Sequence, residues 1–133
     1  MNKILVAYDG GDPGARALAL AAKLARAFGS RVDVVSVVPE GFGRVDGPGE
    51  EPAIVHAREL VEARGLLREQ GIDAGLIEPP GDPADMIERL ATEQGYDTII
   101  VGGRRHPGPD RPWADSVGAH VAANASVTVI VAR

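Results

Sequence analysis

The sequence predicts a single α/β domain in which a parallel β-sheet is covered by helices on both faces. Two observations predict it. Short apolar runs alternate with longer helix-like segments along all 133 residues, and the runs are rich in β-branched residues. A chain of this length typically forms one compact domain, so we assign residues 1–133 to one domain.

The first four segments follow from apolar runs and from residues that begin or end helices. Residues 4–7 are an apolar run before a glycine-containing turn, which predicts a buried strand. A helix is expected over 12–28, because an Asp-Pro pair begins this segment and a glycine follows it. Residues 32–38 predict a second strand, and the glycine-rich segment 39–52 predicts a long loop.

The rest of the chain repeats the alternation. The expected elements are a helix over 53–70, a weaker strand over 73–78, a helix from Asp82, a strand over 98–101, a long loop over 102–115, a helix over 116–124 and a strand over 127–131. The buried side of the helix over 53–70 is expected to contain Ile54, Ala57, Leu60 and Val61, and that of the helix from Asp82 to contain Met86, Ile87, Leu90 and Ala91.

Composition excludes several classes of protein. Without cysteine there is no disulfide framework, thiolate nucleophile or cysteine-ligated metal. A net charge of −5 and an aromatic content of 4% argue against a nucleic-acid or anionic-membrane binder. No apolar run approaches the length of a signal peptide or a membrane span. We therefore expect a soluble, cytoplasmic protein with no nucleic-acid or membrane partner.

Familiar catalytic motifs are absent from the chain. It contains no Walker-type phosphate loop, no dinucleotide-binding glycine fingerprint and no G-x-S-x-G nucleophile turn. His56, His106 and His120 lie far apart in sequence and lack metal-ligand spacing. We expect these histidines to lie on the surface, and we predict neither a metal site nor catalytic residues.

Ligands of parallel α/β sheets bind outside the carboxyl ends of the strands, near the point where the strand order reverses. The loops after the first, second and fourth strands are therefore the candidate site. Asp9 ends the first strand, where it has two interpretations. Its carboxylate binds a ribose hydroxyl or a metal, or it accepts hydrogen bonds from nearby turn amides.

Three strands and one long loop together resemble the universal stress protein family. The runs 4–10, 96–102 and 127–131 look like that family's first, fourth and last strands, and the resemblance covers nearly the whole chain. It implies a three-layer, flavodoxin-like (Rossmann-like) fold whose five-stranded parallel sheet has the order 3-2-1-4-5. It also implies a homodimer.

The resemblance further implies a nucleotide site for ATP or AMP. The ATP-binding branch of the family carries G-x-x-G, nine residues, and then G-[ST]. This chain keeps the spacing, with Gly102 at the first glycine and Ser116 at the hydroxyl position. The candidate nucleotide-binding residues are Ala7, Asp9, Val38, Val101, Gly102, Arg105, Asp115, Ser116 and Val117.

Two positions depart from that motif, because Arg105 and Asp115 replace its second and third glycines. Glycine lets the backbone approach a phosphate closely, whereas Arg105 adds bulk there. An aspartate at the start of a helix caps the amides that would otherwise hold an anion, and it repels phosphate. Arg104, Arg105 and Arg111 are the cations that would offset this charge.

The last strand predicts assembly. In the implied order it is an edge strand without charged residues, and such an edge invites pairing with another chain. In the family it pairs with its symmetry mate, so the candidate dimer interface is Val127, Thr128, Val129, Ile130 and Val131. Val127, Val129 and Val131 are expected on one side of the sheet, with Thr128 and Ile130 on the other.

Two functions stay open at this point. The first is a dimeric stress-response or regulatory module with weak or absent ATP binding and unknown regulatory protein partners. The second is an ATP/AMP-binding, nucleotide-dependent sensor with at most slow hydrolysis, because no general base or catalytic lysine is evident. An enzyme acting on a small metabolite is a third class that the fold alone does not exclude.

Overall fold

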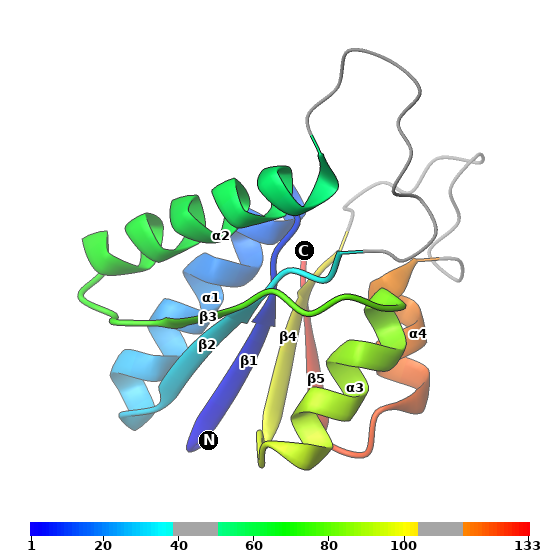
Figure 1. The fold of residues 1–133 in the computed structure, drawn as a ribbon. Helices are drawn as coiled ribbons and strands as arrows, with labels where there is room; N and C mark the ends of the chain where they lie inside the picture. The colour runs from blue at the N-terminus through cyan, green and yellow to red at the C-terminus, as the bar shows by residue number, and fades with distance from the viewer. Residues whose placement is uncertain (39–50, 104–115) are drawn as a thin grey trace.

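A computed structural model of the chain describes residues 1–38, 51–103 and 116–133. Its elements alternate between strand and helix along the chain (Figure 1). They are β1 (Lys3–Ala7), α1 (Asp12–Phe28), β2 (Arg31–Val35), α2 (Pro52–Glu69), β3 (Gly75–Ile77), α3 (Pro83–Glu93), β4 (Thr98–Gly102), α4 (Val117–Asn124) and β5 (Thr128–Ala132).

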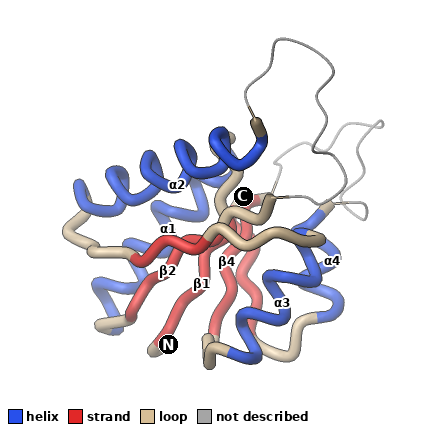
Figure 2. Tube along the Cα trace, in the orientation of Figure 1, coloured by secondary structure: helices blue, strands red, loops and turns tan. Residues whose placement is uncertain are grey.

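The five strands form one parallel sheet in the order β3-β2-β1-β4-β5, which confirms the expected flavodoxin-like fold. Helices α1 and α2 cover one face of the sheet, and α3 and α4 cover the other (Figure 2). Successive residues of β1 supply the two faces in turn. Ile4 and Val6 pack with α1 and α2, while Leu5 packs with α3 and α4.

The central strands of the sheet are buried on both faces. Their sequences are therefore continuous apolar runs and do not alternate between apolar and polar residues. Ile4, Leu5, Val6, Ile99 and Ile100 are fully buried. Burying an aliphatic side chain of this size contributes about 1.5–3 kcal/mol, so these two central strands anchor the fold. Within the described residues, no helix has the length and apolar character needed to cross a membrane.

The start of α1 differs from the prediction by one residue. Gly11 is the N-cap and makes no side-chain capping bond, so Asp12 lies inside the first turn instead of capping it. The acid there remains favourable, because the helix dipole stabilises negative charge in the first turn. The predicted end is confirmed, since Gly29 adopts a left-handed conformation (φ 65°) and its amide bonds the Ala25 carbonyl.

The predicted buried side of α2 is partly wrong. Leu60 is buried as expected, but its buried partners are Ala63 and Leu67, at helical spacing along the same stripe. Ile54 and Val61 are about half exposed, 50% and 55% respectively. The predicted face was therefore rotated relative to the face that packs on the sheet.

The helices on the opposite face are close to their predictions. In α3, Ile87 and Ala91 are buried and Met86 and Leu90 pack at the edge of the same cluster. Its N-cap is Asp82, whose carboxylate accepts a hydrogen bond from the Asp85 amide (3.1 Å). The sequence features of this helix, an Asp-Pro start and an apolar stripe, were therefore sufficient to predict it.

Candidate functional site

A cavity of about 210 Å³ opens at the carboxyl ends of β1, β2 and β4, where a parallel sheet is expected to bind ligands. The strand order reverses there, between β1 and β4. The lining residues come from the ends of these strands and from the first turns of four helices: Ala7, Tyr8, Asp9, Pro13, Gly14, Val35, Ser36, Val37, His56, Pro83, Ile87, Val101, Gly102, Val117 and Gly118.

Five of the predicted site residues line this cavity: Ala7, Asp9, Val101, Gly102 and Val117. Ser116 immediately precedes Val117, at the N-cap of α4. Val38 is not among the residues that line this cavity. Its backbone instead pairs with Pro79 and Gly81, which draws it toward the β3 edge. Arg105 and Asp115, and with them Arg104, Arg111 and His106, lie outside the described residues.

Asp9 makes the turn contact that one of its two interpretations predicts, and its role toward a ligand stays a prediction. Its Oδ1 accepts a hydrogen bond from the Gly11 amide (3.2 Å), as a turn aspartate does. Its side chain is also exposed on the rim of the cavity. The turn bond holds the carboxylate at the end of β1, beside the cavity.

Glycines let β1, β4 and α1 meet at the cavity wall. A side chain at Gly102 would overlap the Pro13 carbonyl in the first turn of α1. A Cβ at Gly14 would lie 2.8 Å from the Tyr8 ring, closer than real contacts allow. The predicted importance of Gly102 therefore has a packing cause that holds whether or not a nucleotide is bound.

The N-cap of α4 is Ser116 rather than the predicted Asp115. Its hydroxyl oxygen accepts a hydrogen bond from the Ala119 amide (3.0 Å). Ser116 thus has a structural role that the nucleotide-motif spacing did not reveal. The first turn of α4 lies beside the cavity, since Val117 and Gly118 line it.

A group of polar residues on the α2 side of the cavity was not predicted. The Oγ of Ser36, just beyond β2, lies 2.5 Å from Nδ1 of His56 on α2. Glu59, one turn further along α2, places Oε2 3.6 Å from the same nitrogen. His56 is therefore not a free surface histidine, because only 22% of its side chain is exposed. The sequence signal for this pairing was weak, since the two residues lie 20 positions apart in the sequence.

These contacts do not make a catalytic relay. A Ser-His-acid triad uses the two different ring nitrogens of the histidine. Here both Ser36 and Glu59 approach Nδ1. Among the residues that the structure describes, this is the one Ser-His contact at the cavity. In the described part of the chain, Ser36, His56 and Glu59 therefore lack the arrangement of a catalytic triad.

The same side of the cavity is acidic. The Tyr8 hydroxyl donates a hydrogen bond to Glu62 (2.9 Å). Burial, this bond and the charges of Glu62, Glu59 and Asp9 raise the pKa of Tyr8. Burial also raises the pKa of Glu59, against the opposing charge of His56. A ligand carrying many negative charges meets repulsion on this side.

A cation lies at the end of β4. Arg16 of α1 donates from Nη2 to the Gly103 carbonyl (2.8 Å), and its Nε is buried without a hydrogen-bond partner. The Gly103 amide in turn donates a hydrogen bond to the Ala132 carbonyl (2.7 Å). Arg16 thus fixes the point where the chain leaves β4, and the sequence analysis did not single it out.

Comparison with known proteins agrees with this architecture. Residues 1–133 match the universal stress protein family. The universal stress protein YxiE of Bacillus subtilis is 30% identical over 99% of each chain. A solved universal stress protein of Archaeoglobus fulgidus has a TM-score of 0.83 and 27% identity over 100% of this chain and 99% of its own. A second structure from that organism, in complex with dAMP, has a TM-score of 0.81. It is 29% identical over 100% of this chain and 98% of its own. The chain therefore belongs to the universal stress protein family.

Proposed function

We propose that this universal stress protein binds the nucleoside part of an adenine nucleotide weakly, prefers AMP to ATP, and acts as a regulatory module without turnover. The observation that carries the proposal is the cavity at the strand-order reversal, which has apolar walls from Val35, Val37, Ile87 and Val101. Its volume of about 210 Å³ is below the ~300–1,000 Å³ of pockets that enclose drug-sized ligands. It suits a base with its ribose better than a whole triphosphate.

Charge supports the preference for a monophosphate. Asp9, Glu59 and Glu62 lie close enough to raise the pKa of Tyr8 at the cavity wall. Each added phosphate brings further negative charge toward these acids, and Coulomb repulsion grows with it. The nucleotide bound by the relative solved with dAMP is also a monophosphate.

Arg16 favours a second candidate, an ATP- or AMP-dependent sensor with at most slow hydrolysis. Its guanidinium lies at the end of β4, and its buried Nε has a proton to donate. Arginine is well suited to phosphate because its planar fork donates parallel hydrogen bonds. In this alternative, Arg16 together with Arg104, Arg105 and Arg111 offsets the charge of a triphosphate.

Calorimetric titration with AMP, ADP and ATP separates the candidates. The wild type is compared with an Arg105→Gly/Asp115→Gly variant, which restores the family's glycines. An Arg68→Ala/Asp73→Ala variant is the control, because it removes the same two charge types from an exposed pair far from the cavity. We expect the wild type to bind AMP with a several-fold lower Kd than ATP, and only the glycine variant to gain ATP affinity.

Val117→Trp tests whether the ligand occupies the cavity. Val117 is 42% exposed at the cavity mouth, so a larger side chain is tolerated by the core and blocks entry. This variant should melt like the wild type and lose AMP binding. Equal micromolar ATP binding by the wild type and the glycine variant would instead support the second candidate, and no AMP binding by the wild type would refute nucleotide recognition.

We also propose that the protein forms a two-fold homodimer through β5 and acts through protein partners. Support comes from the position of β5 at the edge of the sheet. Its side chains alternate as expected, with Val127, Val129 and Val131 against the α3–α4 cluster and Ile130 against the other.

A further inference from the structure

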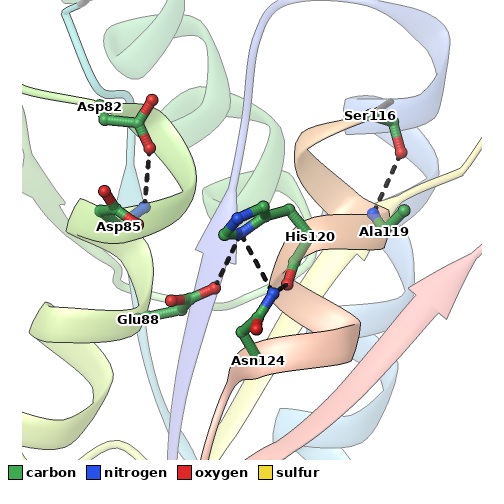
Figure 3. A network of polar contacts seen from close by, with 7 residues as sticks. All are labelled: Asp82, Asp85, Glu88, Ser116, Ala119, His120 and Asn124. Carbon is green, nitrogen blue, oxygen red and sulfur yellow. Dashed lines mark hydrogen bonds and ion pairs between the residues drawn. The ribbon is translucent and has the colours of Figure 1, made fainter. Parts of the chain in front are cut away.

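Three potential metal ligands meet between α3 and α4, on the outside of the molecule and away from the cavity lining. Asp85 and Glu88 lie three residues apart on α3, and His120 lies on α4. One ligand atom from each residue lies within 4.8 Å of the other two. In Figure 3 the His120 ring extends from its helix toward Glu88, with Asp85 one turn away on α3. The cluster contains an imidazole and two carboxylates from two separate helices.

The spacing of Glu88 and His120 already suits a bound ion. Glu88 Oε1 lies 3.3 Å from His120 Nδ1. This separation is longer than the 2.7–3.2 Å typical of an N–H···O hydrogen bond. A tetrahedral Zn²⁺ ion with bonds of about 2.0–2.1 Å holds neighbouring ligand atoms about 3.3 Å apart. An ion between these two atoms therefore needs no movement of either helix.

The two helices hold this geometry through contacts of their own. α3 and α4 pack against each other, and each begins with a side-chain cap, from Asp82 and Ser116 respectively. On α4, Asn124 Nδ2 donates to the His120 carbonyl (2.8 Å) and lies 3.5 Å from His120 Nδ1. The three ligands are thus carried by two capped, packed helices, and their ligand atoms already lie within 4.8 Å of one another.

Simpler explanations cover only part of the cluster. An acid in a first turn is favoured by the helix dipole, which explains Asp85 alone. A histidine–carboxylate ion pair explains Glu88 and His120 alone. Neither explains why a third ligand from the same helix face lies within reach of that pair.

We propose that Asp85, Glu88 and His120 bind a divalent transition-metal ion, with Zn²⁺ the best match and water completing its coordination. Imidazole nitrogen suits Zn²⁺ and similar ions, whereas Mg²⁺ and Ca²⁺ prefer oxygen ligands alone. Three protein ligands with an open position are common for Zn²⁺. The sequence has no cysteine, so no thiolate elsewhere in the chain competes for the ion.

Such an ion would join the two helices that form one wall of the cavity. Pro83 and Ile87 of α3 and Val117 and Gly118 of α4 line that wall. Linking the helices within about one turn of these wall residues stiffens the wall without occupying the cavity. The metal site stands independently of nucleotide binding, because none of its three ligands lines the cavity.

Tag-free protein, stripped with a chelator, is titrated with Zn²⁺ by calorimetry, and with Co²⁺ while visible absorption is recorded. The ligand variants are Asp85→Asn, Glu88→Gln and His120→Gln. Glu93→Gln is the control for an exposed acid on α3 outside the cluster, and His106→Gln is the control for another histidine. We expect one Zn²⁺ per chain and a tetrahedral Co²⁺ spectrum for the wild type. Each ligand variant should lose at least about tenfold in Zn²⁺ affinity, a loss that removing even a supporting residue can cause.

Melting in the presence of chelator separates lost binding from lost folding. The ligand variants should melt there close to the controls, and only the wild type and the controls should gain melting temperature when Zn²⁺ is added. Equal Zn²⁺ affinity in His120→Gln and the wild type would overturn the proposal. So would the absence of wild-type binding at millimolar Zn²⁺.

Discussion

Glu59 is an acid that the fold partly buries at the edge of the cavity. Its Oε2 has no hydrogen-bond partner, although His56 lies 3.6 Å away. Burial raises the pKa of the Glu59 carboxyl, His56 opposes this, and the charges of Asp9 and Glu62 raise the pKa further. The folded state therefore holds the Glu59 proton more tightly than the unfolded state does. Its contribution to stability is full below the unfolded pKa and is lost as pH rises through the folded pKa.

Glu59→Gln should consequently raise the melting temperature at pH 7, because it removes a charge that is costly in its folded environment. The gain should shrink as pH falls toward 4, where Glu59 of the wild type is protonated. Thermal melts at several pH values measure this difference, with Glu69→Gln as the control for an exposed acid on the same helix. A lower melting temperature for Glu59→Gln at pH 7 would mean that the contact with His56 outweighs burial.

At the scale of single elements, α4 depends on its cap. It has only eight residues, and short helices gain little from their own hydrogen bonds. Ser116→Ala removes the bond to the Ala119 amide and should lower the free energy of unfolding by about 1 kcal/mol. Urea unfolding measures the change, and Ser116→Asp, which keeps a capping oxygen, should stay close to the wild type. If Ser116→Ala and Ser116→Asp are equally stable, the cap does not hold this helix.

The elements also show what could be predicted from the sequence. The start and buried face of α3 were predictable because Asp82 and Pro83 mark its start and its apolar residues form a single stripe. The face of α2 was not, because apolar residues occur on two sides of that helix and only packing selects Leu60 over Ile54. Periodicity identifies a helix more reliably than it identifies the side that faces the core.

The candidate site was predictable in the same uneven way. Asp9 follows from topology, because the ends of parallel strands meet at one edge of a sheet, whereas Val101 and Gly102 were chosen through the resemblance to the family. Ser36 and His56 were missed because they lie 20 positions apart in the sequence and only packing brings their side chains to 2.5 Å. The metal-ligand cluster was missed for a similar reason, since 32 residues separate Glu88 from His120. Spacing along the chain carries no information about side chains that only packing brings together.

At the scale of the whole molecule, the two edges of the sheet differ. β3 has three residues and is followed by Pro79 and Pro80, which cannot donate to a ladder. β5 has five residues, none of them charged, and its central valines and isoleucine are only half-buried. A short edge next to prolines resists pairing, whereas a longer uncharged one invites it. The β5 edge is therefore where a second copy of the chain is expected to bind.

Ile130→Lys tests this dimer. Ile130 is the central residue of β5, so in a two-fold pairing of this strand it lies near the axis and close to its own copy. Two lysines there repel each other across the interface, and the variant should be monomeric by light scattering on a sizing column, while the wild type is a dimer. Ile130→Thr removes a similar apolar contact without adding charge and should stay dimeric. It thus distinguishes the effect of charge repulsion at the interface from the effect of losing the isoleucine side chain. A monomeric wild type, or a lysine variant that still forms dimers, would show that the copies do not associate through β5.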